Sequence, residues 1–456
     1  MAKIGFKTAS AFVIANMIGT GVFTSLGFQL LGTTSPYSIM LIWLIGGLTA
    51  FCGALVYSEL GATMPRSGGE YHFLSVIYHP FVGFLSGWAS LIVGFAAPVA
   101  LACMALSSYV CNIYPSINPT LLGMVVLVGI TLLHAFSTNV GTKAQNVLTI
   151  AKILIITVFI IAGFCVSPDG ASNFEPLKDY NTSDIFTSAF AVSLIWVYYA
   201  YSGWNAAAYI INDIKNPRKN VPLALLASTA FVIVLYILLN WIFLRTTPVA
   251  ELSGQVEVGL ISAKHIFGQN IGEFVGLLVA LMLLSSISSM VYVGPRVGVS
   301  MGEDHHLFRF LTKQNKKGTP TAAVWTQFGI SALLILTNSF KIVTQYTGVL
   351  ISIFALLTVV GVFVHRHRFP EAERPYKTWA HPIPPILFGI VILWSVGYLT
   401  YDDYVQTFVE HNQSMMWTTL AGVITIAFGA ILWFVDKAAT PQKEIIETNK
   451  NKNEEI

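Results

Sequence analysis

Apolar stretches dominate the chain, and polar residues gather in short segments between them. About 20 apolar residues suffice for one helix to cross the roughly 30 Å hydrocarbon core of a bilayer. Twelve stretches are this long or close to it, near residues 8–32, 37–62, 81–111, 119–138, 146–167, 184–212, 221–246, 271–302, 320–337, 341–365, 383–402 and 415–436. The pattern predicts an all-α membrane protein with twelve transmembrane helices. A single membrane domain would cover 1–436, followed by a polar tail at 437–456.

Two of the predicted spans are interrupted. The first contains Gly19-Thr20-Gly21 near its middle, and the sixth contains Ser202-Gly203-Trp204 at a similar depth. A glycine inside a helix costs about 1 kcal/mol relative to alanine, and lipid tolerates unwound backbone only where that backbone faces water or a polar ligand. Glycines also let membrane helices pack closely, which is the alternative interpretation.

The two interruptions occupy corresponding positions, because each opens a group of five spans. Five is an odd number, so the second group enters the membrane in the opposite direction. Paired breaks in inverted repeats indicate the midplane binding site of a transporter. The sequence therefore predicts a five-plus-five inverted repeat, 8–167 and 184–365, in which spans one and six are broken. The stretches 383–402 and 415–436 would be added helices.

An unwound pair of spans favours a zwitterionic ligand. Helix N-termini attract a carboxylate, while the carbonyls that end a half-helix attract a cation. The central thirds of spans 1, 3, 6, 8 and 10 contain no Asp or Glu, and Glu59, Glu70, Asp184, Asp213 and Glu273 fall near span ends. This absence of charge fits a zwitterion whose side chain is neutral.

Composition and charge agree with a membrane location. Only 10% of the residues are charged, against about 25% in soluble domains, and a net charge of +3 gives no reason to expect nucleic acid. With the N-terminus in the cytoplasm, 20 of the 25 Lys and Arg residues fall on the cytoplasmic side, four fall outside and Lys152 lies within a span. This bias predicts cytoplasmic N- and C-termini in an inner or plasma membrane.

Lys152 lies more than one turn inside an apolar span. A lysine at the centre of a membrane helix costs about 2.5 to 3.5 kcal/mol, so it normally has a partner or a route to water. Lys152 lies about 8 Å from the start of its apolar stretch, five residues at 1.5 Å each, so its side chain could extend toward the cytoplasm. The alternative is a buried role, and the residue alone does not choose between them.

Several motifs extend the picture over nearly the whole chain. They are NMIGTGVF in span one, YSELGATMPRSGGEYHFL after span two, KAQNVLTIAKI into span five, AYSGWN and IKNPRKNVPLA in and after span six, SSISSMVYVGPRVGVSMGEDHHLF in span eight, GTP before span nine and FPEAERPYKTWAHPIPP before span eleven. Together they resemble the amino acid–polyamine–organocation superfamily, close to its L-type amino acid transporter and bacterial amino acid permease branches. The resemblance implies alternating access around spans one and six.

The resemblance also implies roles for residues at the two interruptions. The substrate would lie against Met17, Gly19, Thr20, Gly21, Tyr199, Ser202 and Gly203. Its carboxylate would meet the amides of Thr20 and Gly21, and its amine would meet the carbonyls of Met17, Tyr199 and Ser202. Thr20 replaces the usual serine and Ser202 a frequent glycine, so the substrate of any one relative does not transfer. Tyr199 would be the aromatic gate that closes over the substrate, although an interior aromatic that only packs is the alternative.

For Lys152 the resemblance implies a second role. In several sodium-independent relatives a lysine at the matching position takes the place of a sodium ion between the carbonyls of span one and small hydroxyls of span eight. The candidate hydroxyls here are Ser285, Ser286, Ser288 and Ser289. His134, His305 and His306 lie at span ends or loops and are expected to be solvated.

The sequence thus predicts a secondary amino acid transporter that needs no sodium, cofactor or metal and works by exchange or by proton coupling. Its expected partners are the amino acid and the lipid bilayer. A sensor of the same fold that does not transport is the alternative. No nucleophile–base pair, phosphate loop or metal cluster suggests an enzyme. We expect no covalent heavy-chain partner, because CNIYPSINP offers only Cys111 at the end of span three.

Overall fold

The computed structural model describes residues 3–33, 35–136, 138–166, 185–337, 340–408 and 413–439. The predicted outer loop between spans five and six, and the tail from residue 440 onward, lie outside the described residues. The described part is helical, and its strand-like pairing is one isolated bridge between Ile4 and Ile214.

Ten helical stretches of the described chain are long and apolar enough to cross a membrane. They are α1 (Phe6–Met17) with α2 (Gly21–Gln29), α3 (Pro36–Thr63), α5 (Pro80–Ala89) with the π-helix η1 (Ser90–Ala96) and α6 (Ala97–Ile113), α7 (Pro119–Phe136), α8 (Thr138–Cys165), α11 (Pro217–Thr246), α14 (Gln269–Val293) with α15 (Pro295–Asp304), α17 (Phe340–Arg368), α18 (Ile383–Phe408) and α19 (Gln413–Ala439).

The other two predicted spans correspond to shorter apolar helices, α9 (Ser188–Tyr201) and α16 (Thr321–Thr337). The stretch 184–212 is not one helix, because α9 ends at Tyr201 and is followed by two short pieces. The short helices of the described chain are α4 (Glu70–Ile77), α10 (Ala206–Tyr209), η4 (Ile211–Asp213), α12 (Val249–Leu252), α13 (Val258–Phe267) and η5 (His306–Thr312).

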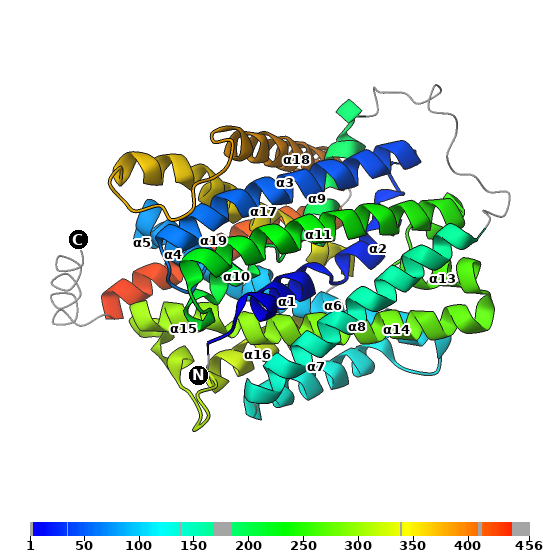
Figure 1. The fold of residues 1–456 in the computed structure, drawn as a ribbon, viewed down its shortest axis with the longest axis horizontal. Coiled ribbons are helices and arrows are strands. Elements are labelled where there is room, and N and C mark those ends of the chain that lie inside the picture. The colour runs from blue at the N-terminus through cyan, green and yellow to red at the C-terminus, as the bar shows by residue number, and fades with distance from the viewer. Residues whose placement is uncertain are drawn as a thin grey trace.

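The long helices run side by side, and α1 lies in the middle of the bundle between α11 and α8 (Figure 1). Helix α8 has one side at the surface of the bundle and the opposite side buried inside it. Its lipid-facing side carries exposed apolar residues at helical spacing: Val147, Ile150, Leu154, Val158 and Ile161. Lys152 is buried on the opposite side of the same helix, against α1 and α14.

One end of the bundle gathers the N-terminal segment, α15 and the end of α19 (Figure 1). The N-terminal segment is tied there by the backbone hydrogen bonds of the Ile4–Ile214 bridge, 2.7 Å from Ile4 N to Asp213 O and 2.8 Å from Lys215 N to Ile4 O. Arg66 pairs with Asp304 at 2.9 Å, and Arg296 pairs with Asp213 at 3.3 Å. This end therefore connects the segments that follow α3, α10 and α14.

Candidate functional site

The two interruptions meet at the centre of the bundle. Helix α1 ends at Met17, and α2 begins at Gly21. Helix α9 ends at Tyr201, and Gly203 continues the chain with φ +92°. A Cβ added at Gly203 would lie 2.8 Å from the backbone carbon of Asn16. Glycine is therefore needed twice over at 203, for the backbone angle and for close contact with the first interruption.

Free amide groups lie where α2 begins. In the described structure the N–H groups of Thr20 and Gly21 have no hydrogen-bond partner, as expected for the first residues of a helix. Such groups favour an anion. The structure thus places the predicted carboxylate donors at a helix start.

The three carbonyls predicted to receive the substrate amine differ in availability. Met17 O accepts hydrogen bonds from Gly19 N at 2.8 Å and from Tyr236 Oη. Tyr199 O accepts one hydrogen bond, from Ser202 N at 3.0 Å, and Ser202 O accepts none within the described residues. Because a carbonyl oxygen has two lone pairs, Met17 O is the least available of the three to an amine.

The Lys152 ammonium lies among the atoms that end α1. Its Nζ donates to Ile18 O at 2.6 Å, to Ser286 Oγ at 2.7 Å and to Ala15 O at 3.5 Å. Ser286 Oγ also donates to Ile18 O at 2.8 Å. The side chain is 1% exposed, so the alternative in which Lys152 reaches toward water is wrong.

The other serines of α14 take different partners. Ser288 Oγ lies 2.8 Å from His134 Nε2, and Ser289 Oγ accepts from Asn16 Nδ2 at 2.7 Å. Ser285 is buried in the same helix. His134 is thus buried against α14, which corrects the expectation that it is solvated. His305 is also buried, with its Nδ1 2.9 Å from Asp436 Oδ2.

Two glycines of the first interruption play unequal parts. A Cβ added at Gly21 would lie 2.3 Å from Ala200 Cα of α9, so this glycine allows α2 and α9 to pack in direct contact. A Cβ at Gly19 would find its nearest neighbour at 3.8 Å. The close-packing interpretation therefore applies to Gly21, whose missing side chain makes room for a helix.

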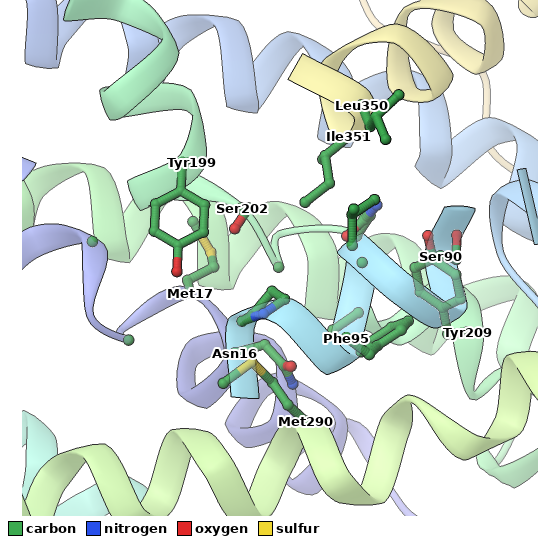
Figure 2. A pocket seen from close by; sticks show the side chains of 18 of the residues that line it. Asn16, Met17, Ser90, Phe95, Tyr199, Ser202, Tyr209, Met290, Leu350 and Ile351 are labelled. Carbon is green, nitrogen blue, oxygen red and sulfur yellow. The ribbon is translucent and has the colours of Figure 1, made fainter. Parts of the chain in front are cut away.

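Tyr199 covers one side of the interruption. Its Oη lies 3.0 Å from Thr20 Oγ1, and its ring packs with Ala97, Leu101 and Val343. In Figure 2 the ring hangs from α9 with its hydroxyl toward the α1 interruption, while Ser90 and Tyr209 lie across the pocket. A hydrogen bond between the hydroxyls of Tyr199 and Thr20 was not predicted.

A pocket that is partly open to solvent connects the two interruptions. Its lining joins residues 16, 17, 19–21, 199, 200, 202, 203, 205 and 206 to the π-helix η1 and to Leu350 and Ile351 of α17 (Figure 2). A π-helix is rare and often accompanies a functional site; in η1, Ser90, Val93 and Gly94 line the pocket. Ser90 and Phe95 were not predicted, since no sequence pattern distinguishes π from α turns.

Glu70 also lines this pocket, although the sequence placed it at a span end and outside the substrate site. Glu70 begins α4 and is 3% exposed. Burial raises the pKa of its carboxyl from 4.5 to about 7, because the charged form loses its hydration.

Tyr236 of α11 is a further residue that sequence reasoning missed. Its hydroxyl contacts Met17 O at the first interruption and Ala200 O at 3.2 Å near the second. A tyrosine within an apolar span was the available signal, because a buried phenol needs a hydrogen-bond partner.

Comparison with known proteins places these features in a family. A family model described as amino acid permease matches residues 4–431, which is nearly the whole chain. The chain belongs to the amino acid permease family. This permease is accordingly a multi-pass membrane transporter of amino acids, and its family consists of transporters and not of enzymes.

Several relatives of this permease are named as amino acid transporters. It is 26% identical to b(0,+)-type amino acid transporter 1 of Mus musculus over 95% of this chain and 87% of that protein. It is 26% identical to Asc-type amino acid transporter 1 of Rattus norvegicus over 95% of this chain and 81% of that protein. Large neutral amino acids transporter small subunit 2 of Oryctolagus cuniculus is 27% identical, with 86% of this chain and 76% of that protein covered.

Proposed function

We propose that this permease carries neutral amino acids across a cell membrane by alternating access, without sodium, and by exchange or proton coupling. The observation that carries the proposal is the meeting of two helix interruptions in one pocket, with free amides on α2 and free carbonyl positions at Tyr199 and Ser202. Amides favour the α-carboxylate and carbonyls the α-ammonium, so the pair suits the part common to all amino acids.

In this proposal, Thr20 and Gly21 bind the carboxylate, and Tyr199 and Ser202 bind the amine with a smaller contribution from Met17. Gly19 and Gly203 form the adjoining backbone walls. Tyr199 is the gate, supported by its packing and by its contact with Thr20. Lys152 with Ser286 substitutes for a bound cation, supported by the carbonyls that its ammonium contacts. Ser285 and Ser288 support α14 around this contact.

The architecture that we propose has twelve spans, with α9–α10 and α16 as the spans beyond the ten long ones. Residues 8–167 and 184–365 form the inverted repeats, 383–402 and 415–436 are the added helices, and both termini are cytoplasmic. Support for the common side of the termini comes from the bundle end shared by the N-terminal segment and the end of α19 (Figure 1). Ion pairs such as Arg66–Asp304 would break when that end opens and form again when it closes.

We also propose that the chain works without a covalent partner subunit. Cys111 is half-buried and its Sγ contacts Ile117 O at 3.3 Å within its own loop. The relative named a small subunit motivates a direct test. In non-reducing conditions the purified protein should run as a chain of 49.8 kDa, and co-purification of a disulfide-linked protein would contradict this.

Purified protein in liposomes tests the function. Uptake of each of the twenty amino acids would be measured with and without internal amino acid, with and without a pH gradient, and with choline replacing sodium. Uptake of neutral amino acids should survive the loss of sodium. Stimulation by internal amino acid would identify exchange, and stimulation by a proton gradient would identify proton coupling. Binding without uptake would instead identify a sensor.

Competition by modified substrates tests the backbone contacts separately. Methyl esters lack the carboxylate and N-acetyl derivatives lack the ammonium, so both should compete poorly with the parent amino acid. An ester that competes as well as its parent would overturn the assignment of Thr20 and Gly21.

A further inference from the structure

Glu70 is a buried carboxyl of the pocket whose hydrogen-bond partners are a phenol and an amide. Its Oε1 accepts hydrogen bonds from Tyr57 Oη at 2.6 Å and from Asn205 Nδ2 at 3.1 Å. Its Oε2 has no hydrogen-bond partner within the described residues. Asn205 belongs to the interrupted stretch between α9 and α10, so one carboxyl group joins α3, α4 and the second interruption.

No basic side chain of the described chain pairs with Glu70. The titratable groups that face it are the phenols of Tyr57, Tyr198 and Tyr209, from α3, α9 and α10. Glu59 offers a comparison, because it is equally buried but contacts Arg366 at 2.7 Å. An isolated buried carboxylate is costly and is normally neutralised by a partner or a proton. Glu70 lacks the partner.

We propose that Glu70 is a proton-binding site of the transport pathway, which holds one proton while the carboxyl is enclosed as in this structure and releases it to water when the stretch around Asn205 moves away. The inference rests on the proposed function and deepens it, since it makes proton coupling a property of a particular residue. It also reconciles a neutral substrate with an acidic pocket, because a protonated Glu70 carries no charge.

A cationic substrate group is the other occupant that a carboxylate attracts. Such a group would lose its own hydration on reaching Glu70, and Tyr57 and Asn205 already donate to Oε1. A proton neutralises the carboxyl without bringing another group into the phenol-lined space. We therefore favour the proton.

The direction of the pH dependence follows from burial. Enclosure raises the pKa of Glu70 to about 7, whereas a carboxyl in water has a pKa of about 4.3. The enclosed, protonated form is fully favoured below pH 4 and loses its advantage as the pH rises through 7. Between these two pKa values the enclosed state loses at most about tenfold per pH unit relative to the hydrated state, and above pH 7 the loss levels off because the carboxyl is then deprotonated in both states.

The test measures initial uptake by proteoliposomes between pH 5.5 and 8.5. Native protein should show a transition with a midpoint near pH 7, and Glu70→Gln should show none over this range. Tyr57→Phe removes a hydrogen bond that favours the carboxylate, so its midpoint should move to higher pH. Glu371→Gln alters an exposed carboxylate and should keep the native profile.

Thermal unfolding of purified protein supplies a second readout that does not require transport. The native Tm should fall between pH 6 and pH 8 by more than the Tm of Glu70→Gln. If the glutamine variant does not fold, the uptake midpoint of Tyr57→Phe still tests the proposal.

An unchanged uptake profile in Glu70→Gln, or a Tyr57→Phe midpoint that moves to lower pH, overturns the proton site and leaves the transporter assignment intact. Selective loss of lysine uptake in Glu70→Gln with an unchanged profile also overturns it, in favour of a cationic substrate. Absence of native uptake at every pH contradicts the proposed function instead.

Discussion

The two helix interruptions are held open by different physical means. At the first, the carbonyls of Ala15 and Ile18 are bound by the Lys152 ammonium, and Ser286 adds a hydroxyl. At the second, no charged side chain contacts the backbone within the described residues. There the left-handed Gly203 contacts Asn16, and no side chain would fit between them.

The difference teaches how each interruption responds to change. Carbonyls left without a donor in an apolar bundle cost about 1 to 3 kcal/mol each, so the first interruption depends on a cation. The second depends on space and on one backbone angle, so it depends on the absence of a side chain. Removal of charge should therefore act at the first interruption, whereas added volume should act wherever backbones are in close contact, at Gly203 and also at Gly21.

The largest effect is expected from Gly203→Ala. A left-handed alanine costs about 1 to 2 kcal/mol, and overlap with Asn16 adds about 1 to 3 kcal/mol. Uptake should fall below detection and the Tm should drop. Gly254→Ala is the matched control, because Gly254 also has positive φ but its added Cβ would lie 3.6 Å from the nearest atom. Equal loss of Tm in both variants would show that overlap with Asn16 does not matter.

The second-largest effect is expected from Lys152→Ala. Uptake should fall by more than tenfold, which corresponds to about 1.4 kcal/mol at the rate-limiting step. The variant leaves Ile18 O without its ammonium donor. Lys377→Ala, at an exposed position, is the control and should transport normally. Near-normal uptake in Lys152→Ala, or a strict need for sodium in the native protein, would remove the cation-substitute role.

Two substitutions of Tyr199 separate the effect of ring packing on uptake from the effect of the hydrogen bond to Thr20. Tyr199→Phe loses the contact with Thr20 Oγ1 but keeps the ring, so uptake should fall by about fivefold, the equivalent of 1 kcal/mol. Tyr199→Ala also loses the packing on Ala97, Leu101 and Val343 and should lose at least twice as much free energy. Equal damage in uptake assays would assign the whole effect to the hydroxyl.

The smallest effect is expected from Gly19→Ala. The added Cβ would meet ordinary contacts at 3.8 Å and 3.9 Å, and alanine reduces the entropy of the unfolded chain. The Tm should change by less than a few degrees. Gly21→Ala, with an overlap of 2.3 Å, should be clearly destabilised in the same assay. The reverse order would show that the first interruption is not packed against α9 as described.

Local residue choice predicted where the helices break, but not how the broken pieces are rotated. Gly19 and Gly21 marked the first interruption in the sequence, and Lys152 marked a buried cation. Four serines of α14 were equal candidates for its partner, because successive helix residues differ by about 100° in direction. Only the packing of α14 against α1 and α8 selects Ser286 and leaves Ser288 to His134. Glu70 entered the pocket for a similar reason, since the residue before α4 contacts the second broken span through a hydrogen bond from Gly69 N to Ala208 O at 3.2 Å.

The hydroxyl of Tyr236 has one hydrogen for two oxygens. It lies against Met17 O and Ala200 O, which belong to the two different interruptions, and a phenol donates a single hydrogen bond at full strength. The two broken spans therefore compete for one donor. If the two spans separate, one carbonyl loses the shared hydrogen bond and the other receives it at full strength. Separation therefore costs less than the loss of a whole hydrogen bond. If the bundle opens and closes as proposed, a shared donor makes each opening less costly than two independent donors would.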